Sequence, residues 1–143
     1  MRNLILSTLA ACVLLAACAS NPMPVPSANY VGAWRLEAIG DRPVVGPRLP
    51  SLTLDTHGHA NGNGGCNSFG GQYTARGATL TFSRMISTMM ACAGPNGEDI
   101  STQEHAMLSI LNGDVRASVA GDAMALTAID GRTLHFRRGP LGS

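Results

Sequence analysis

The stretch that decides the fold is Gly64-Gly65-Cys66-Asn67-Ser68-Phe69-Gly70-Gly71-Gln72-Tyr73. A second motif, Ser87-Thr88-Met89-Met90-Ala91-Cys92, follows downstream. These two stretches contain the only cysteines that follow Cys18. We interpret Cys66 and Cys92 as the ends of a covalently closed structural element rather than as parts of a catalytic site. Asn67, Ser68 and Phe69 are candidates both for shaping this element and for presenting a binding surface.

The first 17 residues have the form of a lipoprotein signal peptide. One arginine precedes an apolar run over residues 4–15. About 12 apolar residues are too few to span a hydrocarbon core, which needs roughly 20, and they fit a secretory signal. Leu15-Ala16-Ala17-Cys18 resembles the lipobox of bacterial lipoproteins. That resemblance implies cleavage before Cys18 and acylation of this residue, whereas ordinary cleavage near Ala17 would leave the protein without an anchor.

Residues 18–31 are predicted to be a lipidated cysteine followed by a Pro-rich tether. Three acyl chains on Cys18 would exceed the two signals needed for stable membrane anchoring. Ala19 follows the cysteine, and by resemblance to the sorting rule of enteric bacteria this implies an outer-membrane anchor with the domain facing the periplasm. Proline at 22, 24 and 26 favours polyproline II, so 11 residues reach about 35 Å from the membrane.

The charge balance argues against two classes of partner. All ten basic residues are arginine, and loss of Arg2 with the leader leaves nine arginines against nine acidic residues. A chain without net positive charge lacks the excess of basic residues with which nucleic-acid-binding proteins contact phosphates. It also lacks the polybasic patch that attracts anionic lipids. We therefore expect the lipid anchor to be the contact with the membrane, and no nucleic-acid partner.

Residues 32–138 are predicted to form one α+β domain. Alternating apolar and polar residues predict strands at 32–39, 51–55, 72–76, 78–83, 115–119, 123–129 and 132–137. A helix is expected after Asn96, with an apolar stripe of Ile100, Met107, Ile110 and Leu111. The Gly-rich stretch 57–65 is typical of a loop. These patterns predict an antiparallel, strongly curved sheet or partial barrel of about six to seven strands with one helix. Residues 139–143 resemble the remnant of a protease site and are left out of this prediction.

The motifs also carry a family likeness. The run Gly65 to Gly71 with Tyr73, the run Ser87 to Cys92, and Glu104 ahead of the helical stripe resemble the META domain of HslJ-like proteins, over about Val31 to Arg137. The resemblance implies a compact α+β domain, often on an envelope lipoprotein and linked to the stress response, without catalytic residues. We therefore expect a non-enzymatic envelope module that requires no cofactor and contacts an envelope protein or a small apolar ligand.

The cysteine pair has three readings. Export places Cys66 and Cys92 in an oxidising compartment, which favours a disulfide. The bridge would close a loop of about 27 residues and stabilise the fold by about 3.5 kcal/mol in the loop-entropy model. Two adjacent buried thiols are the second reading. A reactive thiol or metal ligand is the third.

Two further functions remain as alternatives. The first is a periplasmic copper- or zinc-binding protein, because Asp55, His57 and His59 would share one face of a continuous strand. In that reading the soft Met85, Met89 and Met90 could serve Cu(I). The second is a small hydrolase-type enzyme with Cys66 as nucleophile, for which His105 or His135 would have to be the base. Neither histidine lies in a recognisable catalytic signature.

Overall fold

The computed structural model describes residues 30–96 and 99–139. The signal peptide, Cys18, most of the tether and the tail after Gly139 lie outside these residues. The strands are β1 Gly32–Ile39, β2 Arg42–Pro43, β3 Ser51–Leu54, β4 His59–Asn63, β5 Ser68–Arg76, β6 Thr79–Ser87, β7 Asp114–Ala120, β8 Ala123–Ala128 and β9 Thr133–Arg138. One helix, α1, spans Ile100–Ile110 in the described part of the chain.

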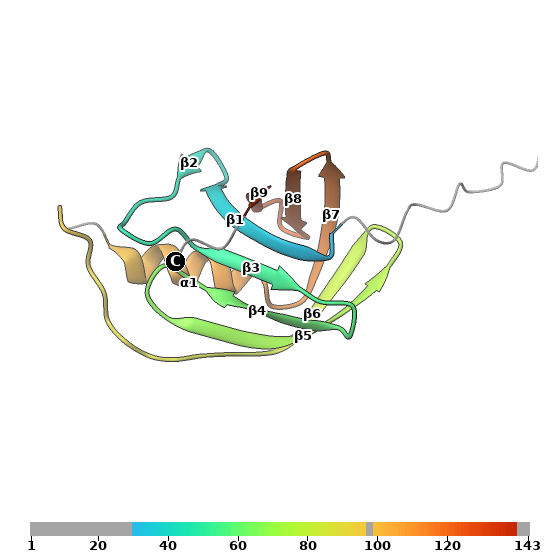
Figure 1. Ribbon diagram of the computed structural model, residues 1–143, viewed down its shortest axis with the longest axis horizontal. Helices are drawn as coiled ribbons and strands as arrows, with labels where there is room; N and C mark the ends of the chain where they lie inside the picture. The colour runs from blue at the N-terminus through green and yellow to red at the C-terminus, as the bar shows by residue number, and fades with distance from the viewer. Residues whose placement is uncertain (1–29, 97–98, 140–143) are drawn as a thin grey trace, which may run out of the picture.

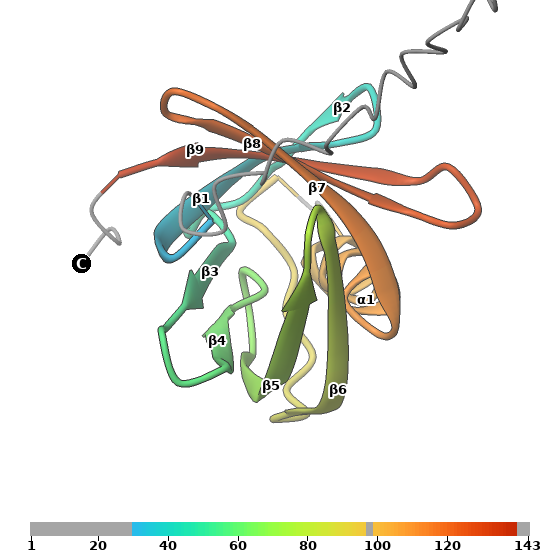
Figure 2. The same ribbon diagram turned by 90° about the vertical axis from the view of Figure 1, so that its right-hand side faces the viewer.

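The sheet closes on itself. Neighbouring strands pair antiparallel in the order β1-β3-β4-β5-β6-β7-β8-β9, and β9 pairs again with β1 from Trp34↔Arg138 to Ile39↔Leu134 (Figures 1 and 2). The short β2 pairs with the end of β1 beside this ring. The described residues thus form a closed eight-stranded barrel with one helix. The antiparallel α+β prediction is confirmed, and the expectation of six to seven strands in a partial barrel is wrong.

The missed strand is β4, which the glycines and asparagines of residues 57–65 had marked as loop. Tertiary pairing overrides local propensity here, because β3 and β5 flank β4 on both edges. Close packing also requires glycine at position 62 of this strand. A Cβ on Gly62 would lie 2.0 Å from the backbone oxygen of Ser51 and 2.8 Å from the Phe69 ring. Glycine in this strand therefore marks close packing rather than a turn.

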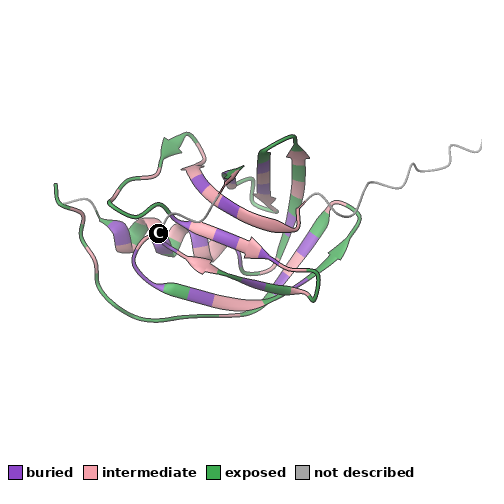
Figure 3. Cartoon of the chain, in the orientation of Figure 1, coloured by how far each residue is buried: buried purple, intermediate pink, exposed green. Residues whose placement is uncertain are grey.

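Alternate residues of the strands fill the barrel interior, as closure requires. Trp34, Leu36, Leu80, Leu126 and Leu134 are each fully buried. Figure 3 shows buried positions alternating with intermediate or exposed ones along the strands. Trp34, the one tryptophan of the sequence, is therefore a core residue.

Helix α1 lies at the end of the barrel where β2 is found, away from the β5–β6 turn (Figure 1). Its Met107 and Ile110, followed by Leu111, join the barrel core, as the apolar stripe predicted. The helix begins later than predicted, because Asp99 rather than Asn96 is the N-cap and its carboxylate accepts the Thr102 amide at 2.8 Å. No helix among the described residues has the length and apolarity to cross a bilayer.

Candidate functional site

A disulfide joins Cys66, which precedes β5, to Cys92, which follows β6; the two Cα atoms are 5.8 Å apart. The bridge therefore ties the chain entering β5 to the segment that leads from β6 towards α1. In this oxidised state the Cys66 sulfur is bonded and is not a free thiolate. The two histidines considered as its base, His105 on α1 and His135 on β9, are both exposed.

Glu104 of α1 lies under this bridge and is 94% buried, with only 6% of its surface exposed. Its Oε2 accepts the backbone amide of Asn67 at 2.6 Å and that of Cys66 at 3.4 Å, and its Oε1 accepts Asn67 Nδ2 at 2.6 Å. Three N–H donors thus replace the water that a buried carboxylate loses. This interaction fixes the helix against the start of β5.

The Asn67 side chain connects Glu104 to the segment after β6. Its Nδ2 also donates to the backbone oxygen of Met90 at 3.0 Å, while its Oδ1 accepts Met90 N at 2.7 Å and Thr88 Oγ1 at 2.9 Å. Both donors and both acceptor positions of the amide are therefore used. Since Asn67 is 3% exposed, its role in this structure is to hold the backbone of residues 88–90.

Two glycines let the chain approach this network. A Cβ on Gly64 would lie 2.3–2.7 Å from three Glu104 side-chain atoms, Cγ, Oε2 and Cδ. Gly65 adopts φ +104°, a conformation that favours glycine, and its amide donates to Asn63 Oδ1 at 2.8 Å. Gly64 thus allows the close approach of the Glu104 side chain, and Gly65 supplies the positive φ.

Three exposed apolar residues lie at the end of β6 and in the segment after it, whose backbone Asn67 holds. Ile86, Met89 and Met90 are 76%, 97% and 59% exposed, and we call these three residues the methionine patch. Ser68 is exposed, whereas Phe69 is buried. Of the three candidate surface residues, Ser68 reaches solvent, while Asn67 and Phe69 face inward. Ser68 and Ile86 also help to line a shallow hollow of about 340 Å³ between β5 and β6.

Asp55 and the two nearby histidines form a separate cluster. Asp55 Oδ1 accepts the backbone amides of His57 and His59, and its Oδ2 bonds His59 Nδ1, each at 2.8 Å. These hydrogen bonds, led by the backbone amide of His59, lower the pKa of Asp55 from 3.8 to about 2. Across residues 30–96 and 99–139, no three His, Cys, Asp or Glu side chains gather into a metal site. The carboxylate here closes the β3–β4 turn.

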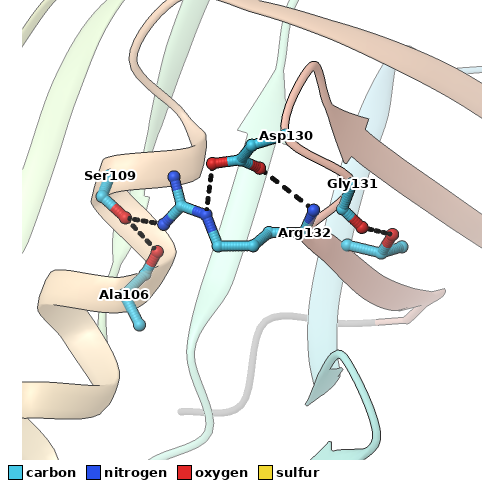
Figure 4. A network of polar contacts seen from close by, with 6 residues as sticks. Ala106, Ser109, Asp130, Gly131 and Arg132 are labelled. Carbon is cyan, nitrogen blue, oxygen red and sulfur yellow. Dashed lines mark hydrogen bonds and ion pairs between the residues drawn. The ribbon is translucent and has the colours of Figure 1, made fainter.

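A second feature lies on the other side of α1, where side chains attach two loops to the helix. Arg132 Nη1 donates to Ser109 Oγ at 2.6 Å, and its Nε donates to Asp130 Oδ2 at 2.7 Å, so the β8–β9 turn is tied to α1 (Figure 4). Gln103 donates to the backbone oxygen of Val45 and accepts its amide, at 3.1 and 2.8 Å. Both loops are therefore positioned by the helix.

These loops and α1 enclose a pocket of about 450 Å³. Its lining residues come from the β1–β2 hairpin, the loop after β2, the first two turns of α1 and the β8–β9 turn: Ile39, Gly40, Arg42, Pro43, Val45, Asp99, Thr102, Gln103, Ala106, Arg132 and Thr133. The sequence left a small apolar ligand as one expectation but did not locate this pocket, because its walls come from segments that are distant in the chain. It also missed the role of Glu104. The available signal was a carboxylate spaced 4, 3 and 7 residues from Ile100, Met107 and Leu111 on one helical face.

Comparisons with known proteins agree on the fold. A family model described as META domain matches residues 28–140. A solved NMR structure of a protein from Burkholderia xenovorans has 26% sequence identity and a TM-score of 0.62, covering 91% of this chain and 99% of that one. A second NMR structure, at 19% identity and a TM-score of 0.63, covers 76% of this chain and 89% of that one and is similar in fold. No relative was found among curated proteins.

Proposed function

This chain belongs to the META domain family, and we propose that it is a non-catalytic binding module of a bacterial envelope lipoprotein. In this proposal the methionine patch contacts an apolar surface of an envelope protein. The observation that carries the proposal is that Met89 is 97% exposed while the backbone beside it is fixed by buried Asn67. Ile86, Met89 and Met90 lie within five consecutive residues, and exposed apolar surface is a feature of interaction sites.

Rigid support makes this patch suited to binding. Met90 is bonded to Asn67 through both its N–H and its C=O, and Cys92 is linked to Cys66. A surface that is ordered before contact loses less conformational freedom when a partner binds. Methionine side chains can in turn adapt to the shape of the partner because they are unbranched and polarisable.

Anchoring through Cys18 completes the proposal. A lipidated cysteine followed by the Pro-rich tether would keep the start of the domain within about 35 Å of the membrane surface. The proposed role is maintenance of envelope integrity under stress. Mass spectrometry of the membrane fraction should find an N-terminal acylated Cys18. An unmodified mature protein in the soluble fraction would refute the lipoprotein part of the proposal.

The patch can be tested with a photo-crosslinking amino acid placed at Met89 in the native host. The matched control carries the same group at Ile129, which is 89% exposed in the β8–β9 turn. We expect a discrete envelope-protein adduct from position 89 and none from position 129. A Met90→Ser substitution in the position-89 variant should weaken the adduct without changing the unfolding curve. Equal labelling from both positions, or none, would refute the proposal.

A further inference from the structure

We propose that the 450 Å³ pocket beside α1 is a second binding site, for an amphipath with one aliphatic chain and a single anionic head that pairs with Arg42. None of the three methionine-patch residues lines this pocket, so the inference goes beyond the proposed function. Its volume falls within the roughly 300–1,000 Å³ that small-molecule sites occupy.

The pocket is framed by fixed elements. Gln103 bonds both backbone groups of Val45, and Arg132 bonds Ser109. On the opposite wall the amide of Gly40 donates to the backbone oxygen of Thr133 at 2.7 Å. A frame held by hydrogen bonds on three sides is preformed, which lowers the entropic cost of binding a ligand.

Aliphatic groups supply the interior of the pocket. Ile39, Pro43, Val45 and Ala106 line it from three different segments. Val45 is 42% exposed, so apolar surface remains open to a ligand. An alkyl chain placed here would gain about 0.8 kcal/mol for each CH₂ removed from water.

The charged residues that line the pocket determine which polar head group of a ligand can bind there. Asp99 uses its carboxylate to cap α1 through Thr102, and Arg132 is bonded to Asp130 and Ser109. The guanidinium of Arg42 has no hydrogen-bond or ion-pair partner among the residues that the structure describes. It lies directly opposite Ile39 in the β1–β2 pairing, so both side chains lie on the same face of the hairpin. An exposed guanidinium beside aliphatic surface matches an anionic head on an alkyl chain.

The experiment compares binding of decanoate and decanol to the purified chain by titration calorimetry below their aggregation concentrations. We expect decanoate to bind at least about tenfold more tightly, which is the factor that one charge-assisted contact supplies. Arg42→Ala should reduce decanoate affinity to the level of decanol and leave decanol unchanged. The matched control is Arg76→Ala, at the end of β5 and outside the pocket, which should change neither affinity.

A second variant locates the ligand. Ala106→Leu keeps a strong helix former on α1 and fills the pocket, so it should weaken decanoate and decanol alike. Absence of decanoate binding at millimolar concentration would overturn the proposal. Equal affinity for both ligands, or decanoate binding insensitive to Arg42→Ala or Ala106→Leu, would overturn it as well. Decanoate bound through Arg42 and displaced by Ala106→Leu would support it.

Discussion

The carboxylate of Glu104 accepts both the backbone and the side-chain amide of Asn67, at 2.6 Å each. These residues are 37 positions apart, and their contact joins α1 to the Gly-rich motif across the barrel end. Because Asn67 also bonds the segment after β6, one buried carboxylate orders three parts of the chain. This pair is therefore a sensitive place to test the structure.

Replacing Glu104 by alanine should destabilise the protein by about 3 kcal/mol, because buried N–H donors of Asn67 lose their acceptor. Urea unfolding of the oxidised protein at neutral pH measures this loss. Glu37→Ala is the matched control. Glu37 is paired with Arg137 on the surface, so its removal should have a much smaller effect. Similar losses in the two variants would contradict the burial assigned to Glu104.

Gly64→Ala should destabilise the protein by about 1–3 kcal/mol, because the new methyl group overlaps the hydrogen-bonded Glu104 side chain. Gly70→Ala is the control within β5. Its Cβ would meet its nearest atoms at 3.9 and 4.0 Å, and alanine restricts the unfolded chain, so its stability should be unchanged or slightly higher. A thermal unfolding series that ranks the two variants in the opposite order would argue against the close approach at Gly64.

Oxidised protein digested with trypsin should yield one disulfide-linked pair of peptides. Cleavage after Arg48, Arg76, Arg84 and Arg116 places Cys66 in peptide 49–76 and Cys92 in peptide 85–116. Mass spectrometry without reductant should find these peptides joined, and reduction should separate them. Breaking the bridge should lower the free energy of unfolding by up to about 3.5 kcal/mol. Two separate peptides from never-reduced protein would be incompatible with the bridge.

Acid should weaken the fold partly through Asp55. Its pKa is lowered from 3.8 to about 2 in the folded state by its hydrogen bonds to the amide and ring of His59 and the amide of His57. A lowered folded pKa gives stability that is complete above about pH 4 and is lost as the pH falls towards 2. Asp55→Asn should therefore flatten the pH dependence of urea unfolding between pH 4 and 2. An unchanged slope in that variant would show that the turn does not depend on the Asp55 charge.

Local patterns in the sequence were sufficient to locate most of the strands. Leu52 and Leu54 alternate with polar neighbours, and glycines at 77, 121 and 131 mark turns where the structure has positive φ. Helix α1 was found from its apolar stripe, although its start was misplaced at Asn96. These features depend on residues close together in the chain, which is why a single sequence reveals them.

Long-range pairing explains what the sequence did not reveal. The closure of β9 on β1 joins residues about 100 positions apart, and no local pattern in either strand records it. Strand β4 was missed because Asn61, Gly62 and Asn63 have the composition of a loop. Phe69 and Asn67 looked like surface candidates within a polar, Gly-rich run. Phe69 instead packs in the barrel core, and Asn67 is buried against Glu104 of α1. In each case the deciding interaction comes from a distant segment.

The pairing of β1 with β9 also determines when the protein can finish folding. Chains are synthesised from the N-terminus, so β1 must wait with one edge unpaired until Arg138, its partner at Trp34, has emerged. Open strand edges invite pairing with other chains. Until β9 is available to pair, the second edge of β1 is therefore open to another chain, and only closure of the barrel removes it.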